Sequence, residues 1–97
     1  FHFGAHDRGL FGSGLVNMET QEGRAAALKA YVESALRNPQ VVGAHWHQFS
    51  DQATSGRFDG EYFQVGWTDI CDRPYPETVK ALREVGYPLY ETRASAK

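Results

Sequence analysis

The chain has 97 residues, of which 41% are hydrophobic and 23% charged, and its formal net charge is −2. This length suits one small domain, and the charge gives no reason to expect a nucleic-acid or anionic-membrane partner. No apolar stretch approaches the roughly 20 residues that a membrane span needs, and the single Cys71 excludes an internal disulfide.

The first expected element is the end of a strand at Phe1 to Gly4, followed by a long loop from Ala5 to Glu19. Loops of about this length inside compact domains are usually functional. Because the chain opens inside a strand and on a residue that is not a translation start, we expect it to be a piece of a longer protein. A Gly-Ser-Gly run at 12–14 has the composition of a phosphate cradle. It contains no Lys or Arg, so a flexible loop is the preferred interpretation.

A helix is predicted next, because the Thr20 hydroxyl can cap its start and the residue before Pro39 avoids the helical region. Apolar residues recur at helical spacing along one face of this helix: Ala27, Leu28, Tyr31, Val32, Ala35 and Leu36. A short apolar strand is predicted over Val41–Trp46.

The segment 48–73 is polar and aromatic, with a short strand or hairpin expected at Tyr62 to Ile70. Pro74 or Pro76 can open the last helix at its first turn, where the missing N–H costs nothing. The inner face of that helix is expected at Tyr75, Val79 and Leu82, with Gly86 just past its end. Residues 87–97 are expected to be a tail.

The resulting order, strand–loop–helix repeated twice, is typical of a parallel α/β fold. Two strands cannot bury both faces of a parallel sheet, so further strands are expected from an upstream chain. A (β/α)8 barrel is the leading candidate, because both long loops follow strands, and barrel enzymes place their chemistry at strand carboxyl ends.

The most informative run is Val41 to Gln52, which turns from an apolar strand into a cluster of rings, amides and a carboxylate. Trp46 offers a flat apolar platform to a sugar ring, and its N–H can donate a hydrogen bond. In strand geometry Gln48 shares the face of Trp46, whereas His45 and His47 share the opposite face.

Two stretches, Phe1 to Gly9 and Ala44 to Gln52, together resemble the carboxyl-terminal end of β-agarases of glycoside hydrolase family 50. The stretches Thr54–Arg57, Asp59–Glu61 and Asp72–Glu77 strengthen this resemblance, which covers nearly the whole chain. It implies a retaining glycosidase on an eight-fold barrel, with an acid/base Glu after strand 4 and a nucleophile Glu at the end of strand 7.

By that pattern the nucleophile lies immediately before Phe1, so no catalytic residue is expected in this chain. Residues 1–97 would be the carboxyl-terminal fragment of a (β/α)8 TIM barrel, of α/β class, containing the end of strand 7, helix 7, strand 8 and helix 8. Residues 88–97 would be its carboxyl-terminal tail. Paired carboxylates perform glycoside hydrolysis, and Asp7 and Asp51 each follow a strand end, but the resemblance argues against a catalytic role for them.

The residues expected to bind substrate lie at the ends of the two strands and in the second long loop: His2, Trp46, Gln48, Asp51, Gln52, Arg57, Glu61 and Trp67. The expected partners are a galactose-containing polysaccharide or oligosaccharide and the remainder of the same barrel. We expect no cofactor, metal, nucleic acid or membrane partner. A polymeric substrate suggests an extracellular or periplasmic location.

Three alternatives remain open. A different barrel glycosidase, such as a β-galactosidase, would share the same architecture. A metal-dependent barrel hydrolase would use His45 and His47, which can chelate one ion from a strand but need further ligands. A non-catalytic carbohydrate-binding module is the third, and it requires the chain to fold alone.

Overall fold

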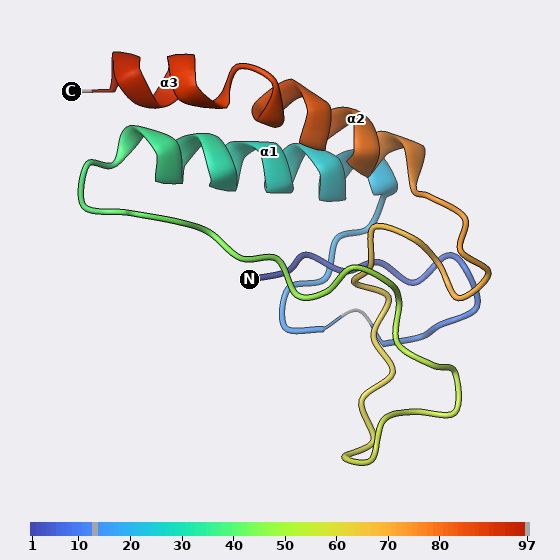
Figure 1. Cartoon of the computed structure of the whole chain (residues 1–97). Helices are drawn as coiled ribbons and strands as arrows, with labels where there is room; N and C mark the ends of the chain where they lie inside the picture. The colour runs from blue at the N-terminus through green and yellow to red at the C-terminus, as the bar shows by residue number, and fades with distance from the viewer. Residues whose placement is uncertain (13, 97) are drawn as a thin grey trace.

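The computed structural model describes residues 1–12 and 14–96. Its helices are α1 (Gln21–Arg37), α2 (Pro76–Gly86) and α3 (Leu89–Ser95). Figure 1 shows α2 and α3 following one another along the same side of α1, while the long loops lie together on the other side of α1.

The predicted first helix is confirmed as α1. The Thr20 hydroxyl accepts a hydrogen bond from the Gly23 N–H at 2.9 Å, and the helix gives way to extended backbone at Asn38, before Pro39. The buried face is displaced from the predicted one toward the amino-terminal half, because Arg24, Ala25 and Leu28 are buried whereas Tyr31 is exposed. The helix therefore buries a charged residue that the apolar pattern did not include.

The predicted last helix is confirmed as α2, which opens at Pro76 and includes Gly86 as its final residue. Its fully buried positions are Thr78, Ala81 and Val85. Val79 and Leu82, which the sequence predicted on the inner face, are half-buried.

The segment predicted as a tail contains α3, which the sequence did not predict. The Arg93 guanidinium of α3 donates hydrogen bonds to the backbone carbonyls of Leu36 and Asn38 at 2.9 and 2.7 Å. These bonds satisfy carbonyl groups at the end of α1, where no intrahelical donor exists. No residue of α3 is buried, so the short helix is held by these polar contacts rather than by a core.

The described residues contain no strand, and the strands predicted at Phe1–Gly4, Val41–Trp46 and within Tyr62–Ile70 are replaced by extended or looped backbone with isolated β-bridges. Strands need partners on at least one edge. Here Val42 is fully exposed. Residues 1–12 and 14–96 thus form no sheet for the 41–46 segment to join.

The hydrophobic core lies between α1 and α2. Ala25 and Leu28 pack against Ala81 and Val85, and four half-buried apolar residues cover this cluster: Phe3, Val32, Trp46 and Leu82. None of the helices in the described ranges is long and apolar enough to cross a membrane.

Candidate functional site

Phe1 lies beside the carboxyl end of the 41–46 segment in the hydrogen-bonding pattern of parallel strands. Its nitrogen donates to the carbonyl oxygen of His45 at 2.8 Å, and its carbonyl accepts from the N–H of His47 at 2.9 Å. In a parallel pair such alternating bonds place one residue opposite another, here Phe1 opposite Trp46. The two predicted strand ends therefore run side by side, as the sequence indicated.

Side chains alternate between the two faces of this pair. The rings of Phe1 and Phe3 lie 5.2 and 6.2 Å from Trp46 on the face that packs against the helices. The imidazoles of His2 and His47 lie 5.9 Å apart. Because neighbouring residues of an extended chain point to opposite faces, this imidazole pair belongs to the face turned away from the helices.

Trp46 reaches a short segment that we call the 65–67 strap, consisting of Val65, Gly66 and Trp67. Its indole N–H donates to the Val65 carbonyl at 2.8 Å, and its ring stacks on that of Trp67 at 6.2 Å. The N–H that the sequence assigned to a sugar hydroxyl is thus engaged within the chain. The platform role of the Trp46 ring stays a prediction.

The Gly66 peptide is held from both sides. The Asp51 carboxylate accepts from the Gly66 N–H at 2.7 Å, and the Arg24 guanidinium donates to the Gly66 carbonyl. A Cβ at Gly66 would overlap the backbone of Ser50 and Asp51, so only glycine fits. The strap is consequently fixed against both α1 and the loop that follows Phe49.

Arg24 is the largest fully buried side chain of the described residues. It also donates to the Phe3 carbonyl at 2.8 Å, and its guanidinium lies 4.8 Å from the centre of the Tyr75 ring. Burial lowers the pKa of Arg24, and the nearby Asp51 acts in the opposite direction. Arginine stays charged in proteins, so this is a buried cation matched by carbonyl oxygens, a carboxylate and an aromatic face.

The fully buried Tyr75 lies between two guanidinium groups, because Arg8 contacts its ring at 4.1 Å. The Tyr75 hydroxyl donates to Asp51. Burial, followed by the hydrogen bond to Asp51, raises the pKa of Tyr75 far above its usual value, so the hydroxyl remains protonated. Burial also raises the pKa of Asp51, and the bonds from Tyr75 and Gly66 only partly offset it.

Both carboxylate oxygens of Asp51 and both ends of the Gln52 amide are therefore occupied within the chain. Gln52 accepts from the Phe63 N–H at 2.8 Å and donates to Glu61 at 3.0 Å. Asp51 and Gln52 are 6% and 4% exposed. Their main contacts hold the second long loop closed, and the sugar contacts predicted for them are untested.

Three other predicted residues lie closer to solvent. Arg57 binds Glu61 at 2.8 Å as well as Asp59, which forms an exposed ion-pair cluster at the tip of the second loop. The Gln48 amide donates to the Ser50 carbonyl at 3.0 Å. Glu61 thus links the buried Gln52 to the exposed Arg57.

Trp67 combines a half-buried ring with a polar group that has no partner. Its ring contacts Trp46 and Phe49, but its indole nitrogen is buried without a hydrogen bond to any described residue. Buried indole N–H groups usually find a partner. The Trp67 N–H therefore offers a donor to a group from outside the described residues.

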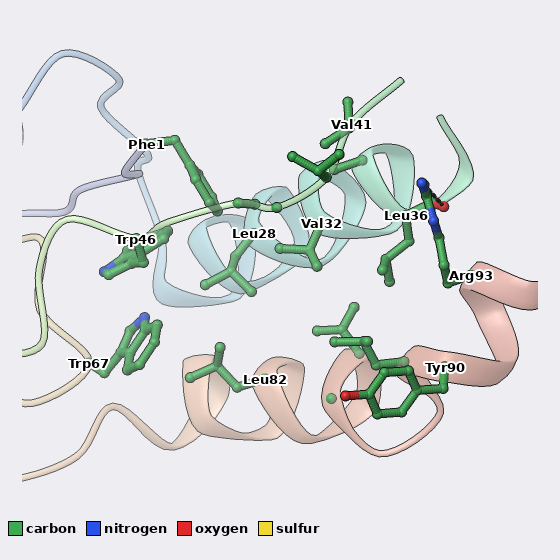
Figure 2. Close-up of a pocket in the computed structure, with 17 residues that line it drawn as sticks. Phe1, Leu28, Val32, Leu36, Val41, Trp46, Trp67, Leu82, Tyr90 and Arg93 are labelled. Atoms are coloured by element: carbon green, nitrogen blue, oxygen red, sulfur yellow. Dashed lines mark hydrogen bonds between the residues drawn. The ribbon is translucent and has the colours of Figure 1, made fainter. Parts of the chain in front are cut away.

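An apolar groove of about 540 Å³ lies between α1, α2 and the 41–46 segment. Figure 2 shows Trp46 and Trp67 at one end of this groove and Tyr90 and Arg93 at the other, with Leu28, Val32 and Leu82 between them. Between its two ends the lining is aliphatic, which suits packing side chains rather than a hydroxyl-rich sugar.

No group of three or more His, Cys, Asp or Glu side chains within residues 1–12 and 14–96 is arranged to hold a metal ion. The alternative that uses His45 and His47 thus finds no further ligands among these described residues. The Gly-Ser-Gly interpretation depends on Ser13, which lies outside the described residues.

Comparison with known proteins reveals similarity along almost the entire chain. β-Agarase B of Vibrio sp. (strain JT0107) is 43% identical over 94 residues, or 96% of this chain, and β-agarase A of the same strain is 40% identical over 97 residues. The chain is a homologue of the β-agarases. It spans about a tenth of the length of these two relatives, and no family model matches it.

Solved structures give the same result for the β-agarase homologue. The structure of an exo-β-agarase superposes with a TM-score of 0.91 at 42% identity, covering 96% of this chain and 13% of that one. The agarase AgWH50C superposes equally well at 40% identity, with 15% of its chain covered. The resemblance inferred from the sequence motifs is confirmed, and the fold is that of a small part of an agarase.

The sequence analysis did not identify the buried polar residues that hold the loops of this chain together. Arg24 has a detectable signal, since it lies one turn before Leu28 on the same face of α1. Tyr75 was predicted as a packing residue, but its bond to Asp51 was not, and Gln64, which is fully buried and contacts Asp7, had no signal. His47 was considered as a candidate metal ligand and was not listed among the substrate-binding residues.

Proposed function

We propose that this chain is part of the (β/α)8 barrel of a β-agarase that cleaves β-glycosidic bonds of agarose or a related galactose-containing polysaccharide with retention. The observation that carries this proposal is the identity of about 40% to two β-agarases along nearly the whole chain. The parallel pairing of Phe1 with the 45–47 segment supports a barrel, because adjacent parallel strands are its building unit.

In this proposal the reacting carboxylates come from outside the chain, with the nucleophile Glu just before Phe1. A retaining enzyme forms a glycosyl-enzyme intermediate with one carboxylate, while the other first donates and then accepts a proton. The chain contributes the surface around them. Of the predicted residues, His2, Gln48, Arg57, Glu61 and Trp67 present polar groups or ring faces to a sugar.

The other three predicted residues act in this proposal mainly through the loops that they hold. Asp51 and Gln52 close the second long loop, and Trp46 joins it to the core through Val65. Any direct sugar contact by these three would add to that role.

The test uses the full-length protein with agarose oligosaccharides, and follows the anomeric configuration of the first product by NMR. Retention gives the β-anomer before mutarotation, which is the expected result. Initial release of the α-anomer would contradict the retaining mechanism, and absence of cleavage would contradict the function itself.

A further inference from the structure

Among the described residues, the imidazole rings of His2 and His47 form a pair of polar rings that lies outside the hydrophobic core. The two rings are 5.9 Å apart, and both residues are half-buried. Their neighbours in sequence, Phe1, Phe3 and Trp46, all pack toward the helices. The pair therefore lies on the opposite face, away from the apolar groove.

The tautomer of His2 is set by the loop beside it. The Leu15 N–H donates to Nε2 of His2 at 3.0 Å, so the ring proton of the neutral form resides on Nδ1. Burial and the neighbouring His47 both lower the pKa of His2, which favours this neutral form. Nδ1 of His2 makes no hydrogen bond to residues 1–12 or 14–96 and remains a free donor in that part of the chain.

His47 is less constrained by side-chain contacts. Its backbone N–H is fixed by Phe1, whereas neither ring nitrogen bonds to any described residue. A neutral imidazole offers one donor and one acceptor. Together, the Nδ1–H of His2 and the two ring nitrogens of His47 provide donors and an acceptor side by side. This combination matches adjacent hydroxyl groups of an uncharged sugar ring, each of which donates one hydrogen bond and accepts others.

We propose that His47, together with His2, binds hydroxyl groups of the neutral galactose-containing substrate, on the face of the strand pair opposite Trp46. This inference rests on the proposed function and adds a binding residue to it. It moves the main sugar contact of the 41–52 run from the indole to the following imidazole.

The experiment compares two substitutions in the full-length protein. His47→Phe keeps the ring shape and removes both hydrogen-bonding nitrogens, whereas His47→Gln keeps a donor and an acceptor. We expect His47→Phe to raise KM for agaro-oligosaccharides roughly three- to tenfold, the effect of one or two neutral hydrogen bonds, and His47→Gln to recover part of this loss. The matched control is His45→Phe, because His45 is exposed and lines a separate groove with Phe3 and Tyr31.

A second measurement does not depend on how the variants fold. Diethyl pyrocarbonate modifies neutral imidazoles, and mass spectrometry of the wild-type protein reports each histidine separately. We expect agaro-oligosaccharide to slow modification of His47 and His2 but not of His45.

The outcomes separate the two proposals. If the wild type cleaves agarose while His47→Phe has an unchanged KM and His47 is not protected, the inference is wrong and the proposed function stands. If the wild type neither binds nor cleaves agarose, the proposed function is wrong. Stoichiometric zinc in the purified protein that disappears in His47→Phe would also overturn the inference, because His47 would then be a metal ligand.

Discussion

The indole N–H of Trp46 donates a hydrogen bond to the carbonyl oxygen of Val65 at 2.8 Å, and Val65 is fully buried. This bond joins the end of the 41–46 segment to the 65–67 strap at the end of the apolar groove where Trp46 and Trp67 lie. The second long loop is thereby tied to the core through a side chain that the sequence assigned to substrate.

Trp46→Phe tests whether this residue acts mainly in packing. The change leaves the Val65 carbonyl buried without a donor, which costs about 1–3 kcal/mol. We expect the free energy of unfolding of the full-length protein to fall by that amount in urea titrations, with KM for agaro-oligosaccharides nearly unchanged. A large rise in KM at unchanged stability would instead support the platform role predicted from the sequence.

Trp67→Phe is the matched comparison. The Trp67 indole nitrogen has no partner among the described residues, so its removal orphans no acceptor within them. We expect a smaller loss of stability than for Trp46→Phe and a higher KM, since Trp67 is a proposed sugar contact. Equal destabilisation by the two substitutions, measured in parallel urea titrations, would argue against this distinction.

Arg24→Met removes the buried guanidinium that bridges Phe3 and Gly66. The carbonyl oxygens left behind are buried, and loss of one partner of a buried charge network typically costs about 3–5 kcal/mol. We expect a strongly lowered thermal midpoint and poor expression of the full-length protein. Arg24→Lys should recover only part of the loss, because an ammonium cannot match the planar fork of Arg.

Lys80→Ala is the control for these stability measurements. The Lys80 side chain is 79% exposed and lies 3.9 Å from Glu84, and exposed pairs of this kind contribute little. A thermal midpoint that falls as much in Lys80→Ala as in Arg24→Met would mean that the assay does not report the buried network.

Asp51→Asn is expected to change the pH dependence of stability. The pKa of Asp51 is raised in the folded protein, chiefly by burial, so the folded state binds its proton more tightly than the unfolded state. The stability that this group contributes is present below its unfolded pKa and is lost as pH rises through the folded value. The free energy of unfolding of the wild type minus that of Asp51→Asn should therefore decrease from pH 3 to pH 7.

This difference, measured by urea titration across the pH range, isolates Asp51 from other carboxylates such as Asp7 and Asp69, whose pKa values are lowered. Asp7 and Asp69 make stability increase with pH, and they are present in both the wild type and Asp51→Asn, so their effect cancels in the difference. A difference that increases with pH would show that the Tyr75, Gly66 and Arg24 contacts outweigh burial.

The isolated chain should bind the dye ANS strongly, because its groove of about 540 Å³ presents aliphatic and aromatic side chains that no sheet of the described residues covers. We expect a fluorescence increase that the full-length protein does not share. Weak dye binding together with a cooperative unfolding transition would indicate that the chain folds alone, as the binding-module alternative requires.

Local signals in the sequence predicted both main helices, because capping by Thr20 and the first-turn position of Pro76 depend on neighbouring residues only. They did not predict α3, whose contacts come from α1 through Arg93. They placed strands where the described residues form none, since a strand is completed by hydrogen-bonding partners on its edges.

The candidate site also divides into features that local sequence predicts and features that depend on distant residues. The motifs identified the relatives, because a run such as 44–52 is recognisable without knowing its neighbours. The hydrogen bonds from Arg24 to Gly66 and from Tyr75 to Asp51 join residues 24 or more positions apart. The position of Arg24 on α1 indicates which face it lies on, but no local pattern indicates these partners.

Phe1 pairs with residues 45–47, so the number of residues between them determines which side chains of the 45–47 segment face the core. A single inserted or deleted residue after α1 that shifted this register by one position would exchange the two sides of the strand. The indole of Trp46 would leave the core and the imidazole of His47 would enter it. An insertion between Pro39 and Val41 should therefore be tolerated only when the added residue is looped out. Phe1 then still lies opposite Trp46.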